Sequence, residues 1–245
     1  MPAKHCVKAL VLENKPLGGG IFKMIAEWPY GAEAGQFFMV RGWDKYPLLS
    51  RPISVHDADE KTVTFLYEVR GEGTRILSEK KAGEEVELTG SVGRGFPVEK
   101  VKGKVAVVSG GIGIAPLLLT VKKLQDCEVT LCCGFRDKSY SLDEFAPYVK
   151  EIRVATDSGR EGHKGFVTDL LDVAEFDCVV TCGPEVMMEK LAKTCIGKGV
   201  KCYVSMERHM ACGVGACLGC THETAHGARC ICKDGPVFEG EEIYA

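Results

Sequence analysis

The stretch Val105-Ala-Val-Val-Ser-Gly-Gly-Ile-Gly-Ile-Ala-Pro116 joins a short apolar run, a glycine-rich turn and a proline. An uninterrupted apolar run such as Val105 to Val108 is typical of a strand buried on both faces of a parallel sheet. Pro116 suits the first turn of a helix, and the pattern predicts that helix over 115–124. A strand, a tight turn and a helix in this order predict one unit of a layered α/β domain.

The same alternation continues on the C-terminal side of this stretch. The sequence predicts a helix at 184–196 and further strands at 129–133, 152–155, 178–181 and 201–205. Repetition of strand and helix is typical of a doubly wound sheet. We therefore expect an α/β domain over 101–205.

Two of its turns are expected to bind a nucleotide. Glycines 110, 111 and 113 lie between a strand and a helix, where backbone N–H groups can approach a phosphate. Gly111-x-Gly113 is not the dinucleotide fingerprint, because Pro116 stands where the third glycine would be. A second turn, Cys182-Gly183-Pro184, ends another strand at the same carboxyl edge, where open sheets bind ligands. Each turn alone is also compatible with a plain tight turn.

Residues 1–100 differ from the rest in pattern. Short runs of alternating apolar and polar residues occupy 36–40, 62–67 and 85–89, and glycine-bearing turns at 17–20, 71–73 and 93–95 separate them. Many short strands with such turns predict a small β-barrel.

One segment of this region is a candidate binding site. Arg51 could pair with a pyrophosphate through two hydrogen bonds, Pro52 holds the chain extended, and Ser54 offers a hydroxyl. Taken alone, Arg51 fits a solvated surface charge better than a ligand contact, and the argument gains force only jointly with the other motifs. Further contacts to the same ligand could come from downstream residues, namely Leu66, Tyr67, Glu68, Gly73 and Thr74.

The segment 206–245 contains the most specific motif. Cys212, Cys217 and Cys220 have the C-x4-C-x2-C spacing of a plant-type [2Fe–2S] cluster, with a more distant fourth ligand. Cys230 and Cys232 compete for that position, and Cys232 precedes an Asp-Gly-Pro turn that redirects the chain. Structural zinc is the alternative, but it usually needs two short-spaced pairs. We expect this segment to hold little besides the cysteine loop, stabilised by its metal.

Composition excludes several classes of protein. The chain has 245 residues, 45% of them hydrophobic, which suffices for two domains or one large domain with a sizeable core. A net charge of −3 gives no electrostatic reason to expect binding to nucleic acid or to an anionic membrane. The sequence has no apparent signal peptide or membrane-spanning run. The thirteen cysteines are typical of a reducing, cytoplasmic setting.

Four separate motifs give a joint resemblance. Arg51-Pro-Ile-Ser54, Gly73-Thr74, Gly110 to Pro116 and Cys182-Gly-Pro184 resemble the ferredoxin–NADP reductase superfamily. The cysteine segment narrows this resemblance to the electron transfer subunits of type B dihydroorotate dehydrogenases. The resemblance covers essentially the whole chain.

This resemblance implies a multidomain protein with an FAD-binding β-barrel, an NAD-binding α/β domain and a small C-terminal [2Fe–2S] segment. It implies FAD contacts from Arg51, Pro52, Ile53 and Ser54 and from the downstream residues named above. It also implies Cys212, Cys217, Cys220 and Cys232 as cluster ligands. The superfamily often has tyrosine where Ile53 stands, and eleven residues between Cys220 and Cys232 form a short spacer for this family.

The implied reaction needs a partner. A catalytic subunit carrying FMN would oxidise dihydroorotate, and electrons would pass through the cluster and FAD to NAD+ in pyrimidine biosynthesis. The expected assembly is a heterotetramer of two copies of each chain, and no catalytic acid, base or nucleophile is needed in this chain. Two alternatives remain: a related NAD(P)H-linked flavin and iron–sulfur reductase subunit that serves sulfide, ferredoxin or a hydrogenase, and a non-enzymatic, zinc-stabilised nucleotide-binding interaction module.

Overall fold

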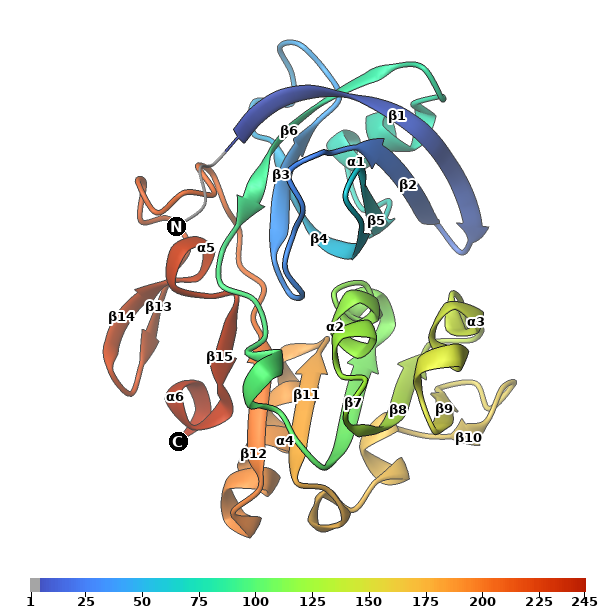
Figure 1. The fold of residues 1–245 in the computed structure, drawn as a ribbon, viewed down its shortest axis with the longest axis vertical. Coiled ribbons are helices and arrows are strands. Elements are labelled where there is room, and N and C mark those ends of the chain that lie inside the picture. Colours follow the sequence, from blue (N-terminus) through green and yellow to red (C-terminus); the bar gives the residue numbers. More distant parts are fainter. Residues whose placement is uncertain (1–4) are drawn as a thin grey trace.

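The computed structural model describes residues 5–245, which form a barrel, a layered α/β unit and a cysteine-bearing tail (Figure 1). In Figure 1 the barrel lies above the α/β sheet and the tail lies along one side of both. Within the described range, no helix combines the length and apolar character needed to cross a membrane.

The N-terminal unit is a closed six-stranded barrel with the order β1-β2-β5-β4-β3-β6, which confirms the predicted β-barrel. Trp28, Phe38 and Phe65 form the centre of its core, with edge-to-face ring contacts. Its elements are β1 (His5–Gly18), β2 (Ile21–Glu27), β3 (Phe37–Arg41), β4 (Arg51–Ala58), β5 (Thr62–Glu68), α1 (Glu72–Glu79) and β6 (Glu85–Val92).

Glycines 71 and 73 lie at the start of helix α1 rather than in a turn between strands. The Thr74 hydroxyl accepts hydrogen bonds from the N–H groups of Arg70 and Gly71, at 3.0 and 3.2 Å. This bonding satisfies donors at the helix start and explains why a helix forms where the glycines predicted a turn.

The α/β unit is built on a seven-stranded sheet of order β10-β9-β8-β7-β11-β12-β15. Its strands are parallel except β15, which runs antiparallel to β12. The strands are β7 (Lys104–Gly110), β8 (Glu128–Phe135), β9 (Glu151–Thr156), β10 (His163–Lys164), β11 (Cys178–Cys182), β12 (Lys201–Ser205) and β15 (Val237–Glu239).

Helices cover both faces of this sheet, as a doubly wound fold requires. The predicted helix at 115–124 is shorter than expected: a 3₁₀ turn occupies Gly111–Ile114, and α2 follows Pro116. The helical elements are η1 (Val98–Lys100), η2 (Gly111–Ile114), α2 (Leu117–Lys123), α3 (Leu142–Phe145), η3 (Ala146–Tyr148), η4 (Val167–Leu170), η5 (Val173–Glu175) and α4 (Glu185–Lys198).

The tail has more structure than the sequence predicted. Beyond the cysteine loop it forms a hairpin and adds β15 to the edge of the α/β sheet. Val237 and Phe238 alternate between the two faces of that sheet and are buried in two different cores, so packing as well as metal can hold the tail. Its other elements are β13 (Thr221–Thr224), β14 (Gly227–Cys230), α5 (Ile231–Asp234) and α6 (Gly240–Tyr244).

Candidate functional site

A cleft of about 1270 Å³ runs between the barrel and the carboxyl edge of the α/β sheet. The barrel contributes the β1–β2 turn and the end of β5, including Glu68. The sheet contributes the two turns that the sequence singled out, so both predicted nucleotide-binding segments line one cavity. This position agrees with the rule that open α/β sheets bind ligands at the carboxyl ends of their strands.

The two turns touch each other through their glycines. A Cβ added to Gly113 would lie 2.6 Å from the Cα of Gly183, and one added to Gly110 would lie 2.5 Å from Cδ of Pro184. Gly111 differs, because its φ is +55° and no atom lies within 4 Å of an added Cβ. Gly110 and Gly113 are therefore needed for packing between the turns, whereas Gly111 faces open space in the cleft.

Cys182 is a buried structural residue behind the cleft rather than a reactive one. Its side chain is 1% exposed at the end of β11, and burial raises the pKa of its thiol. The following residues, Gly183 and Pro184, line the cleft, whereas Cys182 does not.

The far end of the cleft contains residues that sequence reasoning missed. Arg136 and Asp157 follow the ends of β8 and β9, and Phe166 follows β10. The Phe166 side chain is 70% exposed, although its backbone N–H is held by the Asp169 carboxylate at 3.0 Å. The ends of the predicted strands point to the first two residues, but no local sequence feature marks Phe166.

The structure brings together the two parts of the predicted FAD site. A Cβ on Gly73 would lie 2.6 Å from Nε of Arg51, so the start of α1 packs directly against the Arg51 guanidinium. That guanidinium also lies 5.4 Å from the ring centre of Trp43, a cation–π contact. Arg51 is half-buried, so it is not a freely solvated surface charge.

The other predicted FAD residues differ in their exposure and in whether their polar groups are already hydrogen-bonded. Ile53 and Leu66 are buried, and Pro52 is exposed. The Tyr67 hydroxyl donates to Oδ1 of Asn14 at 3.0 Å. Ser54 and Glu68 are half-buried, whereas the Thr74 hydroxyl is engaged at the start of α1.

Backbone N–H groups converge on the sulfurs of the cysteine loop. Sγ of Cys212 accepts from the N–H groups of residues 214, 216 and 217 at 3.3–3.4 Å. Sγ of Cys232 accepts from Gly215 at 3.1 Å, and Sγ of Cys220 from the N–H of Cys232 at 3.4 Å. Gly213 and Gly215 have φ of +67° and +79°, which lets the loop fold back over the sulfurs.

These surroundings shift the pKa values of two of the thiols in opposite directions. Burial opposes ionisation of Cys212, but the N–H groups of Val214, Cys217 and Ala216 outweigh it and lower the pKa of its thiol to about 6. Burial and the adjacent Cys220 thiol raise the pKa of Cys232 to about 12. The raised pKa of Cys232 means that this thiol needs a nearby cation in order to ionise.

The thiols are arranged as two pairs. Cys212 interacts with Cys217, and Cys232 interacts with Cys220. Across residues 5–245, no three His, Cys, Asp or Glu side chains are grouped to hold a single metal ion. Backbone N–H groups point at these sulfurs and suit the negative charge of an iron–sulfur cluster, so the donor set fits a [2Fe–2S] cluster.

Cys230 has a different position from the four paired cysteines. Its thiol lies 3.7 Å from Oγ1 of Thr221, and its N–H donates to Oδ2 of Asp234 at 2.8 Å. This bond to Asp234 is at the start of α5, which carries Cys232 towards Cys220.

The cysteine loop touches the barrel beside the predicted FAD segment. A Cβ on Gly213 would collide with the Met39 side chain of β3. Met39 is paired with Pro52 of β4 in the barrel sheet. One strand therefore separates the cysteine loop from the segment Arg51–Ser54.

Comparison with known proteins supports an iron–sulfur tail and relates the whole chain to one family. The profile for the iron-sulfur cluster binding domain of dihydroorotate dehydrogenase B matches residues 207–244. The dihydroorotate dehydrogenase B (NAD(+)) electron transfer subunit of Clostridium acetobutylicum is 47% identical over 243 residues, which is 99% of this chain and 98% of that protein. The chain belongs to this family.

Other members of the dihydroorotate dehydrogenase B electron transfer subunit family align equally fully. The protein of Clostridium perfringens is 45% identical, covering 98% of this chain and 99% of that one. The protein of Caldanaerobacter subterraneus is 38% identical, with 97% and 98% covered.

Solved structures have the same fold. The structure of the NADH-dependent reduced ferredoxin–NADP oxidoreductase superposes with a TM-score of 0.85 at 28% identity, over 96% of this chain and 89% of that one. A ferredoxin NADP+ reductase from Neisseria gonorrhoeae, with bound FAD and NADP, has a TM-score of 0.64 at 18% identity, over 84% and 95%. This likeness confirms the predicted barrel and α/β architecture, and the chain is an oxidoreductase component.

Proposed function

We propose that this chain is the electron transfer subunit of an NAD-dependent dihydroorotate dehydrogenase. It would carry electrons from an FMN-containing catalytic subunit through a [2Fe–2S] cluster and FAD to NAD+, in pyrimidine biosynthesis. The observation that carries this proposal is the packing of Gly213 against Met39, one strand from Arg51–Ser54. It brings the thiols beside the segment assigned to FAD, as electron transfer between the two groups needs.

The FAD site combines charge with a helix start. The Arg51 guanidinium faces the first turn of α1 at Gly73, so a pyrophosphate there would meet both a cation and backbone N–H groups. Pro52, Ile53 and Ser54 would line the ligand from β4. Leu66, Tyr67 and Glu68 would position it from β5, and Thr74 would act by fixing the start of the helix.

The cluster would be held by Cys212, Cys217, Cys220 and Cys232, two thiolates for each iron. Hydrogen bonds from the loop's N–H groups to these sulfurs would stabilise the more negative, reduced state and so raise the reduction potential.

NAD would lie along the cleft, with its pyrophosphate at the open face of Gly111 and its nicotinamide towards the barrel. Gly110, Gly113, Cys182, Gly183 and Pro184 would shape the wall behind it. The adenosine would then extend to the far end, where Phe166 presents an exposed ring and Asp157 a carboxylate.

This division of labour follows from the chemistry of the carriers. Nicotinamide exchanges a hydride, a [2Fe–2S] cluster exchanges single electrons, and a flavin can do both. The residues of this chain then bind, orient and exclude water, and none has to act as acid, base or nucleophile.

The exposed side of the cysteine loop is a suitable surface for binding a partner subunit. Cys217 is exposed, and the neighbouring Leu218 is 63% exposed at a φ of +60°. The relatives are named as electron transfer subunits, which supports a catalytic partner carrying FMN. We extend this to a heterotetramer of two copies of each chain, located in the cytoplasm, where the thiols stay reduced.

A second candidate is an NAD(P)H-linked subunit that serves ferredoxin instead of dihydroorotate. The TM-score of 0.85 to the NADH-dependent reduced ferredoxin–NADP oxidoreductase favours it. Identity of 47% over nearly the whole chain favours the dihydroorotate system over that structure's 28%.

Anaerobic purification tests the proposal. We expect bound FAD, two irons and two sulfides per chain, NADH oxidation with artificial acceptors, and dihydroorotate oxidation only after the FMN subunit is added. A preparation that contains zinc and no flavin would refute the proposal, and ferredoxin-dependent turnover without any response to dihydroorotate would establish the second candidate.

A further inference from the structure

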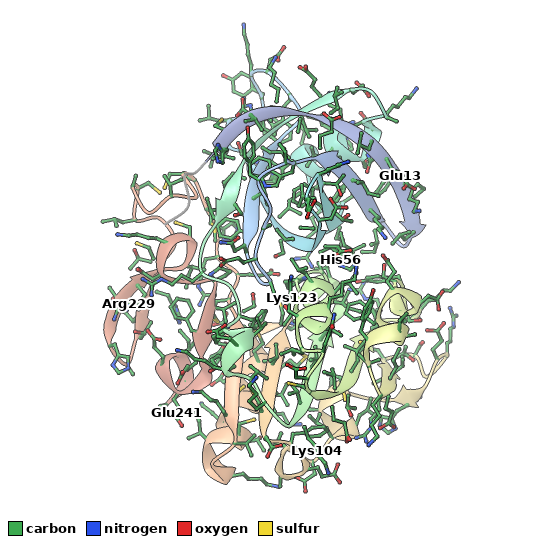
Figure 2. The ribbon with its side chains drawn as sticks, viewed as in Figure 1. Glu13, His56, Lys104, Lys123, Arg229 and Glu241 are labelled. Atoms are coloured by element: carbon green, nitrogen blue, oxygen red, sulfur yellow. The ribbon has the colours of Figure 1, made fainter. Side chains whose placement is uncertain are left out.

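His56 lies where the barrel meets the α/β unit (Figure 2). It is on β4, two residues beyond Ser54, and its side chain is 0% exposed. A histidine without any solvent contact must satisfy its ring nitrogens inside the protein or leave them unpaired at a cost.

One ring nitrogen joins the two cofactor segments. Nδ1 of His56 lies 2.8 Å from the backbone oxygen of Ala115. A carbonyl oxygen can only accept, so Nδ1 carries the hydrogen and donates it. Ala115 lies between η2 and α2, in the same turn as Gly111 and Gly113. A single hydrogen bond therefore connects the strand assigned to FAD with the turn assigned to the pyrophosphate of NAD.

The other ring nitrogen, Nε2, faces α3 and has no hydrogen-bond partner among residues 5–245. Nε2 of His56 lies 3.7 Å from Oε1 of Glu144, and Oε2 of the same carboxylate accepts from Nζ of Lys23 on β2. The Phe145 ring packs edge-on against the imidazole, with the ring centres 6.2 Å apart. Two strands of the barrel and one helix of the α/β unit thus determine where the ring can lie.

A second ion pair also crosses between the two units, but it does not involve the Ala115 carbonyl. Nζ of Lys122 on α2 lies 2.5 Å from Oδ2 of Asp57 on β4. Each of the two side chains is more than a quarter exposed. This pair ties the same strand to the last turn of α2 rather than to the backbone of the glycine turn, so it serves as a control for contact between the units.

We propose that His56 is a positioning residue, which sets the distance between flavin and nicotinamide by tying β4 to the carbonyl of Ala115. The inference rests on the proposed function and adds a specific residue to it. Hydride transfer needs donor and acceptor atoms about 3–3.5 Å apart, and misplacement by 1 Å can cost on the order of 100-fold in rate. The two cofactors are held by different units, so the contact between the units determines that distance.

Two substitutions separate the hydrogen bond from the bulk of the ring. His56→Asn keeps an N–H donor close to the position of Nδ1, whereas His56→Leu fills much of the space without a donor. Lys122→Met breaks the second ion pair. Each variant is purified with FAD, and its flavin content and thermal unfolding are measured first, so that unfolded or flavin-free protein is recognised.

The decisive measurements are the rate of flavin reduction at saturating NADH and the long-wavelength charge-transfer absorbance of the nicotinamide–flavin pair. We expect His56→Leu to lose the absorbance band and to slow reduction by about 10- to 100-fold, with the Kd for NADH changed by less than about 3-fold. His56→Asn and Lys122→Met should stay within about 3-fold of the original protein. Equal rates in His56→Leu and the original protein, or equal losses in His56→Leu and His56→Asn, would overturn the proposal.

A readout that does not depend on turnover is hydrogen exchange of the peptide 110–118. FAD binding should slow exchange there in the original protein and in His56→Asn, but not in His56→Leu. If FAD protects this peptide equally in all three, the connection through His56 is refuted. If the original protein fails to bind FAD or to be reduced by NADH, the proposed function fails first and this inference fails with it.

Discussion

Met39 occupies the space in which a Cβ of Gly213 would lie. This contact joins the cysteine loop to β3, and the pairing of Met39 with Pro52 extends it to β4. The position of the loop against the barrel is thus determined by shape as well as by metal binding.

Gly213→Ala should destabilise the protein and lower its iron content. The added Cβ meets Met39, and a φ of +67° costs a non-glycine residue about 1–2 kcal/mol on its own. Gly227→Ala is the control, because Gly227 has a φ of +86° with nothing within 4 Å of an added Cβ. Thermal unfolding should show a larger loss for Gly213→Ala, and equal losses would contradict a role for Met39.

Cys232→Ser should abolish the [2Fe–2S] cluster, whereas Cys230→Ser should retain it. Cys232 lies beside Cys220, and Cys230 lies beside Thr221. Iron and sulfide analysis, with the paramagnetic signal after dithionite reduction, distinguishes the two variants. Cluster loss in Cys230→Ser alone would show that the fourth ligand was assigned to the wrong cysteine.

Phe166→Ala should raise the KM for NADH by about threefold to tenfold, because it removes the stabilisation that one ring stacked on the adenine provides. Turnover of reduced nicotinamide mononucleotide, which lacks the adenosine, should not change. Tyr148→Ala is a matched loss of a surface aromatic, since Tyr148 is 41% exposed and does not line the cleft. A similar effect of Phe166→Ala on both substrates would refute an adenine site at this ring.

Asp157→Asn should weaken the preference for NADH over NADPH, on the order of tenfold. A carboxylate at the end of a strand favours a ribose 2′-hydroxyl and repels a 2′-phosphate. The ratio of kcat/KM for the two nucleotides measures the effect. An unchanged ratio would mean that the ribose lies elsewhere in the cleft.

The Lys23–Glu144–His56 contact should make stability depend on acid pH in a defined range. His56 and Lys23 lower the pKa of Glu144 from 4.5 to about 2. A lowered pKa in the folded state stabilises the protein above the unfolded value, and this contribution is lost as the pH falls from about 4.5 through about 2. The Tm advantage over Glu144→Gln should therefore be present at pH 6 and disappear towards pH 2. An advantage that persists at pH 2 would contradict this account.

The features that the sequence predicted correctly are local ones. The run at 105–108 with its glycine turn, and the spacing of Cys212, Cys217 and Cys220, each depend on a few consecutive residues. Strand type, turn chemistry and ligand spacing are set at that range. The barrel and the α/β sheet followed from such signals.

The features that the sequence missed depend on long-range contacts. Phe166 comes to line the cleft only because the chain returns after β10 across the carboxyl edge of the sheet. His56 has no sequence neighbour that predicts a bond to Ala115, 59 residues away. Periodicity predicts that a side chain is buried, but not which side chain or backbone group it will contact.

The strand β15 has a consequence for solubility. It covers the outer edge of β12, whose residues Cys202–Ser205 are buried, while the opposite edge of the sheet ends in the two-residue strand β10. A chain whose tail detaches after loss of iron would uncover a hydrophobic edge able to pair with another copy. Oxygen-damaged preparations should then precipitate through strand pairing rather than through general unfolding.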